Sequence, residues 1–384
     1  MAQIWKGVVR EYADFMPEHI LRDVVTLGEG GNALIAAPAV GAMLKEITGV
    51  NAKVFIKFEG RNPTGSFKDR GMTSAMSAAK GKGAKVVVCA STGNTSASAA
   101  AYATAAGILP AVLVPDGKIA MGKLAQAIAH GAKLLQVNGN FDDCLVLARK
   151  LAENYDVELV NSVNPDRIQG QKTAAFEVVD ELGDAPTIHA LPVGNAGNIT
   201  AYWKGYREYY TANCSSTLPF MWGFQAEGAA PIVLGHEVDN PETIATAIRI
   251  GKPASWEQAV AARDESNGVI EAVSDAQILE AHRILSAEVG VFVEPASAAG
   301  LAGILKKART GTFTPDLSPS LDKGEPMNIV ITCTGHGLKD PEWALNDING
   351  NSKGSEVEPV KVQNDLSAVA SILRLPAPMT ERDL

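Results

Sequence analysis

The chain has 384 residues, of which 46% are hydrophobic and 20% charged, and its formal net charge is −9. This length favours two domains over one, and the composition is that of an ordinary globular protein. A negative chain without a basic cluster longer than Lys306-Lys307 excludes an extended electrostatic surface for nucleic acid or an anionic membrane. Any phosphate must therefore be bound locally, by backbone amides and a few side chains.

The N-terminus and the cysteines predict a cytoplasmic protein without a metal site. No charged region followed by an apolar run opens the sequence, and the apolar stretch at residues 33–44 is too short to span a bilayer. Cys89, Cys144, Cys214 and Cys333 are far apart, which is typical of reduced thiols. The histidines form no pair with metal-ligand spacing.

The first half of the chain is predicted to alternate strands and helices. A glycine-rich loop at residues 26–32 precedes a strand at 54–59, whose side chains alternate between apolar and polar, and a helix at 70–80. Further strands are predicted at 86–90, 111–115, 133–137 and 157–160, and further helices end near 106, 130 and 154. This alternation predicts an α/β fold with a doubly wound parallel sheet.

The second half continues the same pattern with one interruption. A helix at 167–182, a strand at 187–193, a helix ending near 210 and a strand at 220–226 are followed by an irregular excursion at 227–270. We then expect helices at 275–289 and 296–307, a proline-rich surface loop at 310–326, a strand at 327–333 and a final helix at 365–373.

One lysine lies in a turn that precedes a predicted helix, Asn62-Pro63-Thr64-Gly65-Ser66-Phe67-Lys68-Asp69-Arg70-Gly71. The Asn-Pro pair and Gly65 are turn signals, and glycines let the backbone approach a ligand closely. An amine placed in this way can form an imine with an aldehyde cofactor. A lysine near a helix start is more often a solvated cation, so the residues downstream decide between the two interpretations.

Hydroxyl groups and an amide follow the strand at 86–90, in Ser91-Thr92-Gly93-Asn94-Thr95. Open α/β sheets bind ligands at the carboxyl ends of their strands, and the N–H groups at a helix start can hold a small anion such as a carboxylate. A helix N-cap also selects Ser, Thr or Asn, but one such residue is enough for a cap. We therefore interpret this loop as a ligand site.

Two more loops follow predicted strands. Gly194-Asn195-Ala196-Gly197-Asn198 can turn backbone N–H groups toward a phosphate at a helix N-terminus. It has neither the GxGxxG pattern of a dinucleotide site nor the GK[ST] of a nucleotide P-loop, so a single phosphate on a small cofactor fits better. Thr334 stands at the end of the strand at 327–333, where a threonine is usually structural.

Together, Lys68 and the three loops resemble the fold type II enzymes that use pyridoxal 5′-phosphate. The lysine turn, residues 91–96 and residues 192–198 are similar to the threonine synthases of the shorter bacterial type, in the tryptophan synthase β-like family. The resemblance extends from about Gly30 to Asp340. It implies two doubly wound α/β domains with mostly parallel twisted sheets. The implied activity is the last step of threonine biosynthesis, from O-phospho-L-homoserine and water to L-threonine and phosphate.

The resemblance also implies a role for each matching residue. Lys68 would hold the cofactor as a Schiff base and carry protons at Cα and Cβ of the substrate. Asn94 would hydrogen-bond the ring oxygen O3′, and Thr334 would face the pyridine nitrogen. Five residues would hold the cofactor phosphate: Gly194, Asn195, Ala196, Gly197 and Asn198. Ser91, Thr92 and Thr95 would bind the substrate carboxylate, and Asn161, Ser162 and Arg167 the substrate phosphate.

We expect residues 1–80 plus 162–384 to form a larger domain that binds the cofactor phosphate. Residues 81–161 would form a smaller, mobile α/β domain, with the active site in the cleft between them, and the protein would be a homodimer. The alternatives are a serine/threonine dehydratase or a cysteine synthase on the same fold, neither of which needs a pocket for a substrate phosphate, and a cofactor-binding protein without turnover. Two features depart from the family pattern, His336 and the proline-rich segment at 310–326.

Overall fold

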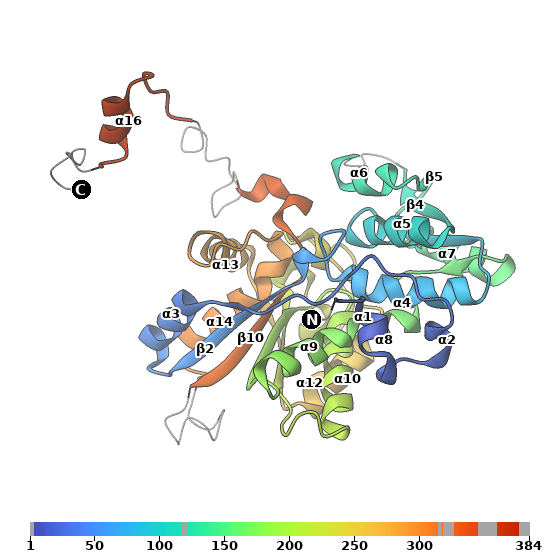
Figure 1. The fold of residues 1–384 in the computed structure, drawn as a ribbon, viewed down its shortest axis with the longest axis horizontal. Helices are drawn as coiled ribbons and strands as arrows, with labels where there is room; N and C mark the ends of the chain where they lie inside the picture. Colours follow the sequence, from blue (N-terminus) through green and yellow to red (C-terminus); the bar gives the residue numbers. More distant parts are fainter. Residues whose placement is uncertain (1–3, 117–120, 314–316, 318–325, 345–358, 376–384) are drawn as a thin grey trace. The chain divides into compact units, whose positions relative to one another are not determined.

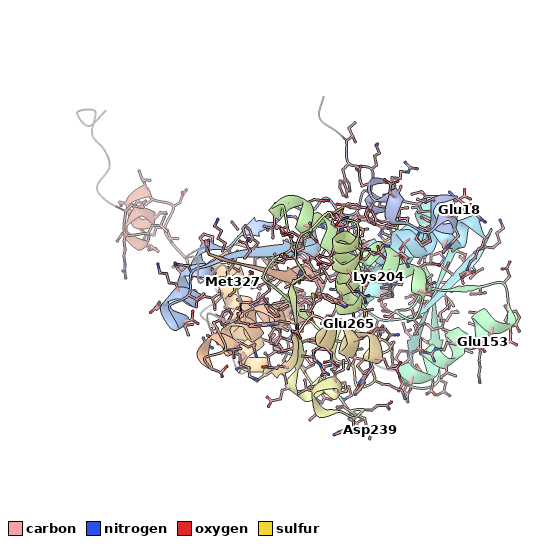
Figure 2. The ribbon with its side chains drawn as sticks, turned by 90° about the horizontal axis from the view of Figure 1, so that it is seen from below. Glu18, Glu153, Lys204, Asp239, Glu265 and Met327 are labelled. Carbon is pink, nitrogen blue, oxygen red and sulfur yellow. The ribbon has the colours of Figure 1, made fainter. Side chains whose placement is uncertain are left out.

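The structure is a computed structural model that describes residues 4–116, 121–313, 317, 326–344 and 359–375. The chain divides into two compact units, Met1–Pro341 and Glu342–Leu384. In the described part of the chain, no helix is long and apolar enough to cross a membrane. Exposed charged residues such as Glu18, Glu153 and Asp239 lie on separate outer parts of the larger unit (Figure 2).

A six-stranded sheet is the centre of the larger unit, with the strand order β1-β2-β10-β7-β8-β9. Its neighbouring strands β2 and β10 are labelled in Figure 1. β1 runs antiparallel to β2, and the other neighbours are parallel. The strands are β1 (Ile35–Ala36), β2 (Ala52–Phe58), β7 (Ile188–Pro192), β8 (Phe220–Ala226), β9 (Val269–Val273) and β10 (Met327–Cys333).

Helices cover both faces of this sheet because successive side chains of a strand point to opposite faces. Ile329 and Ile331 of β10 pack into one hydrophobic core, and Val330 packs into the other. The first core also contains side chains from α3 (Pro38–Thr48), α13 (Asp275–Ala287) and α14 (Ala299–Arg309). The second contains side chains from α9 (Thr173–Leu182), α10 (Gly197–Thr211) and α12 (Trp256–Glu265).

A second, four-stranded sheet is entirely parallel and has the order β5-β4-β3-β6. Its strands are β3 (Val86–Ala90), β4 (Leu109–Pro115), β5 (Lys133–Val137) and β6 (Glu158–Leu159). Side chains of α4 (Lys68–Gly81), α5 (Asn94–Ala106) and α6 (Met121–Ala129) pack on one face, and α7 (Phe141–Asn154) packs on the other. The sequence-based prediction of an α/β fold with mostly parallel sheets is confirmed.

The remaining elements are short. They are α1 (Val8–Glu11), η1 (Ala13–Phe15), α2 (Glu18–Leu21), η2 (Glu59–Arg61), α8 (Pro165–Gln171), η3 (Glu227–Ala229), α11 (Pro231–Leu234), η4 (Thr246–Ile248), η5 (Pro295–Ala298), η7 (Gly337–Lys339), η8 (Pro341–Ala344) and α16 (Leu366–Ile372). The last of these, α16, confirms the predicted final helix, and Asp365 caps it by accepting a hydrogen bond from the N–H of Ala368.

The structure corrects three predictions of local structure. The irregular excursion at 227–270 contains helix α12 and the start of strand β9. The single helix predicted at 167–182 is two helices, α8 and α9, which meet at Lys172, where the Thr173 hydroxyl donates to the Gly170 carbonyl at 2.7 Å. Helix α4 begins at Lys68, two residues before the predicted start at 70. Most of the loop predicted at 310–326 lies outside the described residues.

Candidate active site

The predicted site residues follow the carboxyl ends of two groups of adjacent strands. In the six-stranded sheet, Lys68 follows β2, Thr334 follows β10, and the loop at 194–198 follows β7. In the four-stranded sheet, the loop at 91–95 follows β3, and Asn161 follows the neighbouring β6. Ligands of open parallel sheets bind at such ends, so the topology collects residues from the whole length of the chain.

Lys68 is the first residue of α4, and its side chain is half-buried. Its amine lies 4.1 Å from the centre of the Phe67 ring and forms no hydrogen bond to another described residue. Burial and the nearby Arg167 guanidinium lower the pKa of the Lys68 amine to about 7, although the Glu294 carboxylate opposes this shift. A substantial fraction of the amine is therefore neutral near neutral pH, as attack on an aldehyde requires.

A buried ion network fixes the helix that carries Lys68. The Arg70 guanidinium donates to both carboxylate oxygens of Glu59, at 2.6 and 2.8 Å, and to both oxygens of Glu177, at 2.6 Å each. Lys57 adds a second cation, 2.6 Å from Glu177. Burial alone would raise the pKa of Glu177, but Arg70 and Lys57 lower it to about 2. This network was not predicted from the sequence, because charged residues are usually exposed and nothing in the sequence indicated that these are buried.

Asp69 ties the lysine turn to α5. Its buried carboxylate accepts hydrogen bonds from the backbone N–H of Thr64 at 2.7 Å, the Thr64 hydroxyl at 2.6 Å and the Ser98 hydroxyl at 2.6 Å. Burial raises the pKa of Asp69 to about 6 in spite of these donors. The turn is thus held from both sides, which orients Lys68.

Thr334 belongs to a turn that lies directly against the lysine turn. Its carbonyl accepts a hydrogen bond from the Phe67 N–H at 2.9 Å, and the next residue, Gly335, forms a bridge with Ser66. The Thr334 hydroxyl is buried and lies 2.9 Å from the Ser297 hydroxyl. Ser297 also accepts from the Gly335 N–H at 2.8 Å. Ser297 was missed in the sequence, although it follows Glu294-Pro295 just before a helix.

The loop at 194–198 has the geometry of an anion site. Ala196 adopts the left-handed conformation with φ of 65°, directly before α10, so the loop ends at a helix N-terminus. A Cβ atom on Gly194 would lie 2.9 Å from Cα of Ile248, so the close approach of these segments requires glycine. The amide nitrogen of the Asn198 side chain is buried and has no hydrogen-bond partner within the described chain. A phosphate on this loop would satisfy such groups.

The loop at 91–95 is half-buried throughout. The Ser91 hydroxyl accepts a hydrogen bond from the Gly93 N–H at 3.2 Å. Over the described residues, the Thr92 and Thr95 side chains form no hydrogen bond, which leaves both hydroxyls for a ligand. The Asn94 amide donates to both oxygens of Glu294, at 3.0 and 3.1 Å.

The predicted substrate-phosphate residues are held in different ways. The Asn161 side chain bonds both the N–H and the carbonyl of Ala90, at 2.9 Å each, and so supports the end of β3. The Asn195 amide donates to the Ser162 hydroxyl at 3.1 Å, which connects the loop at 194–198 to the segment at 161–167. Asn161 therefore has a structural task, and a direct contact of its side chain with substrate stays a prediction.

Arg167 is a buried cation that forms no ion pair with any residue the structure describes. Its side chain is 1% exposed, one Nη donates to the Val160 carbonyl at 3.3 Å, and its Nε has no hydrogen-bond partner among the described residues. Burial lowers the pKa of Arg167 to about 10. A buried charge is costly unless it is paired, so this arrangement is suited to an anion that arrives with a ligand.

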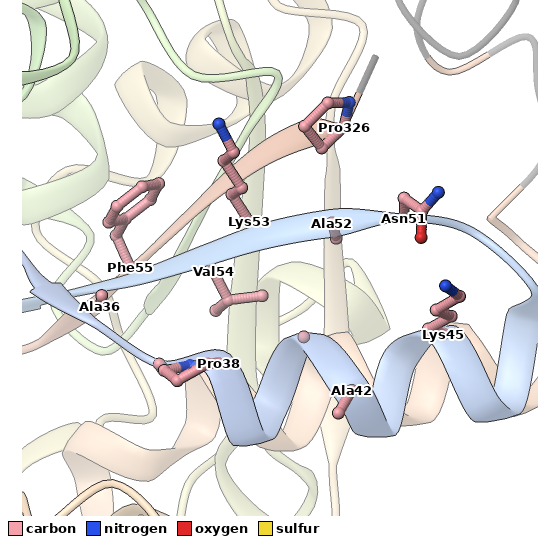
Figure 3. A pocket seen from close by; sticks show the side chains of 12 residues that line it. Ala36, Pro38, Ala42, Lys45, Asn51, Ala52, Lys53, Val54, Phe55 and Pro326 are labelled. Carbon is pink, nitrogen blue, oxygen red and sulfur yellow. The ribbon is translucent and has the colours of Figure 1, made fainter. Parts of the chain in front are cut away.

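The residues present fit pyridoxal 5′-phosphate. The Asn198 nitrogen and the left-handed Ala196 suit its phosphate, the buried Thr334 hydroxyl suits its ring nitrogen, and the Lys68 amine suits its aldehyde. A cavity of about 610 Å³ elsewhere does not involve these residues. It lies at the sheet edge between α3 and β2, where Lys53 and Phe55 point to one side of the strand and Val54 points toward the helix (Figure 3).

Comparison with known proteins gives the same result. Residues 25–319 match the family described as pyridoxal-phosphate dependent enzymes. The chain is 57% identical over 347 residues to a threonine synthase of Mycobacterium leprae, covering 90% of this chain and 92% of that protein. It is 51% identical over 369 residues to a threonine synthase of Synechocystis, covering 96% and 91%. A threonine synthase of Methanocaldococcus jannaschii is 45% identical over 377 residues, covering 96% and 87%.

Solved structures share the fold at low sequence identity. Maize serine racemase superposes with a TM-score of 0.66 at 21% identity, over 87% of this chain and 94% of that one. A threonine deaminase of Solanum lycopersicum gives a TM-score of 0.66 at 22% identity, over 87% and 86%. These similarities support the fold, and the reaction has to be inferred from the residues of the site.

Proposed function

Because the chain belongs to the pyridoxal-phosphate dependent enzymes and, within them, to the threonine synthases, we propose that it acts at the site around Lys68. It is a pyridoxal-phosphate-dependent lyase of threonine biosynthesis. The proposed substrate is O-phospho-L-homoserine, which reacts with water to give L-threonine and phosphate.

The unpaired guanidinium of Arg167 is the observation that carries this proposal. A dehydratase or a β-replacing synthase handles substrates without a phosphate and has no need of a buried cation beside its lysine. Arg167 is close enough to Lys68 to lower the pKa of its amine, so an anion bound there lies next to the reacting atoms. The Ser162 hydroxyl and the Asn195 amide, which are hydrogen-bonded to each other, would complete the phosphate pocket.

The cofactor, when bound, supplies an electron sink that acidifies the substrate protons at Cα and then at Cβ. In our proposal the neutral Lys68 amine removes these protons in turn, and its pKa of about 7 suits a group that must both accept and return them. Arg167 stabilises the phosphate as it leaves Cγ. Ser91, Thr92 and Thr95 hold the substrate carboxylate, while Asn94 and Thr334 position the cofactor ring. Water would add its oxygen at Cβ and give up one proton, Cγ would take up a proton to become the methyl group of threonine, and Lys68 would return a proton to Cα.

We also propose the larger organisation predicted from the sequence. Residues 81–161, which contain the four-stranded sheet, would form a small mobile domain, and residues 1–80 plus 162–384 would form the larger one. The active site would lie in the cleft between them, since both sheets direct their carboxyl ends to it. The protein would act as a homodimer in the cytoplasm.

The test is release of phosphate from O-phosphohomoserine by the purified protein, compared with release of ammonia from threonine and serine. We expect phosphate release to dominate, and Arg167→Ala to lower kcat/KM for O-phosphohomoserine about 100-fold, because a charged hydrogen bond in a buried site contributes about 3 kcal/mol. Most of the loss should appear in KM, with the visible absorbance of the cofactor retained.

Arg22→Ala is the matched control, because Arg22 is exposed and, among the residues that the structure describes, its one ion pair is a 3.8 Å contact with Glu18. Ser162→Ala tests the same pocket without removing a buried charge, and should raise KM by a smaller factor. An unchanged KM in both site variants would remove this segment from the substrate pocket. Faster ammonia release than phosphate release would favour a dehydratase.

A further inference from the structure

Glu294 is a buried carboxylate at the centre of the site that has no part in the roles described so far. It directly precedes η5, and its side chain is 5% exposed. None of the ion pairs formed within the described chain includes it. A buried carboxylate without a paired cation is costly, so this position calls for an explanation beyond packing.

Its contacts join two of the loops that form the site. Both carboxylate oxygens accept from the Asn94 amide, at 3.0 and 3.1 Å. The carboxylate also lies over Gly335, where a Cβ atom would come within 2.4 Å of Oε1. On the backbone, the Glu294 N–H donates to the Gly335 carbonyl at 3.2 Å. Glu294 therefore sits between the Asn94 loop and the Thr334 turn.

The acceptor oxygens of Glu294 decide how the Asn94 amide is turned. An asparagine can present either its oxygen or its nitrogen to a neighbour, and a carboxylate accepts only from the nitrogen. The Asn94 nitrogen carries two N–H groups, so one can bond Glu294 while the other remains for a ligand oxygen. Asn94 is the residue that we expect to donate to the ring oxygen of the cofactor.

The charges around Glu294 connect it to Lys68. Burial raises the pKa of Glu294, whereas the Asn94 amide and the Lys339 and Lys68 charges lower it and Asp340 raises it further. Lys339 itself is engaged by Gln126. Glu294 packs over Gly335, which forms a bridge with Ser66, two residues before Lys68. From this position the Glu294 carboxylate raises the pKa of the Lys68 amine, whereas burial and the Arg167 charge lower it. Glu294 thus opposes the effect of Arg167 on the amine.

We propose that Glu294 is a positioning residue for the threonine synthase reaction, which orients the Asn94 amide for the cofactor and supplies the negative charge that faces the Lys68 amine. This role rests on the proposed function for the identity of the reaction, whereas the contacts of Glu294 with Asn94 and its charge do not depend on the substrate. Two substitutions separate the two tasks: Glu294→Gln keeps an acceptor oxygen for Asn94 and removes the charge, whereas Glu294→Asp keeps the charge and shortens the reach.

The first experiment measures the protonation of Lys68 without any reaction. The full chain is freed of cofactor, its fold is checked by circular dichroism, and labelling of Lys68 by acetic anhydride is followed against pH by peptide mass spectrometry. Removing a nearby negative charge destabilises the ammonium form, so Glu294→Gln should move the midpoint to lower pH by on the order of one unit. Glu294→Asp should leave the midpoint near that of the wild type.

The second experiment measures cofactor affinity by titrating the same proteins with pyridoxal 5′-phosphate and following absorbance. Glu294→Asp should weaken binding about fivefold, the effect of one lost hydrogen bond, and Glu294→Gln should weaken it less. Glu288→Gln is the control for net charge, because Glu288 is exposed at the C-terminal end of α13. This variant should change neither the labelling midpoint of Lys68 nor the affinity for the cofactor.

An unshifted labelling midpoint in Glu294→Gln would overturn the electrostatic part of the proposal, and wild-type affinity in Glu294→Asp would overturn the positioning part. Both readouts are independent of substrate. If phosphate release from O-phosphohomoserine failed while these shifts were seen, the proposed substrate would be wrong and the role of Glu294 would stand.

Discussion

The hydroxyl of Thr334 depends on a neighbour that the sequence does not single out. Ser297 accepts a hydrogen bond from the Gly335 N–H, so its own proton is available for Thr334, 2.9 Å away, or for the more distant Gly335 carbonyl at 3.3 Å. When Ser297 donates to Thr334, the Thr334 proton would remain for the ring nitrogen that we propose it faces. Ser297 therefore sets the direction in which Thr334 can donate.

We expect Ser297→Ala to weaken binding of pyridoxal 5′-phosphate about five- to tenfold, because it leaves the buried Gly335 N–H without this acceptor and Thr334 without its donor. Absorbance titration of the cofactor-free protein measures the change, and KM for the amino-acid substrate should change less. Ser286→Ala removes a hydroxyl that donates to the His282 carbonyl on α13 and should bind the cofactor normally. Normal binding by Ser297→Ala as well would show that the hydroxyl pair does not position Thr334.

At the scale of elements, the sequence predicted strands well where they are apolar and continuous. β3, β5, β8 and β10 begin and end at the predicted residues. β3 and β8 are buried almost throughout, as their apolar runs indicate, whereas β5 leaves its polar Lys133 and Gln136 exposed. The prediction failed at 227–270, where glycines and prolines concealed the polar helix α12. The sequence also placed Lys68 and Thr334 after strands, as the structure has them, whereas their roles stay predictions. It missed Ser297 and Glu294, since their tasks depend on contacts between segments far apart in the chain.

The crossing of α4 and α8 brings Arg167 to Lys68, and two glycines make it possible. A Cβ atom on Gly170 would lie 1.8 Å from the Arg70 carbonyl oxygen, and one on Gly71 would lie 3.0 Å from the Arg167 carbonyl oxygen. Two backbones can approach this closely only without side chains. The position of the unpaired cation in the site thus follows from helix packing.

We expect Gly170→Ala to lower the free energy of unfolding by about 2–3 kcal/mol, because the new methyl group must force α8 away from α4. Guanidinium denaturation measures this as a lower midpoint. Gly81→Ala on α4 is the matched control: its nearest neighbour would be 3.5 Å away, and alanine favours the helix, so the midpoint should stay or rise. Equal midpoints for wild type and Gly170→Ala would mean that the helices can separate without cost.

The stability of the whole molecule depends on a polar side chain that is buried in its core, the imidazole of His189. On β7 of the six-stranded sheet, His189 is fully buried, with one ring nitrogen 2.6 Å from the Tyr206 hydroxyl and the other 2.8 Å from the Thr332 hydroxyl. Burial, aided by the charge of Lys57, lowers the pKa of His189 to about 3. The folded protein therefore keeps this imidazole neutral through the pH range in which an unfolded chain would charge it.

This histidine should make the whole protein sensitive to acid. Between about pH 6.5 and pH 3 the unfolded chain binds a proton at His189 that the folded chain does not, so lowering the pH favours unfolding. From pH 6.5 to pH 4 the loss is about 3 kcal/mol. As the pH is lowered, the thermal unfolding midpoint of His189→Gln should therefore fall less steeply than that of the wild type. This holds even though the variant is less stable at neutral pH.

The control is His236→Gln, which removes an exposed histidine that bonds the Glu237 carbonyl and should keep the wild-type slope. Glu177, whose pKa is lowered to about 2, also costs stability as the pH falls below its unfolded value. It is present in all three proteins, so its contribution cancels in the comparison. Parallel curves of unfolding midpoint against pH for the wild type and His189→Gln would contradict this prediction. They would show that His189 is protonated in the folded state, after its hydrogen bonds to Tyr206 and Thr332 have opened.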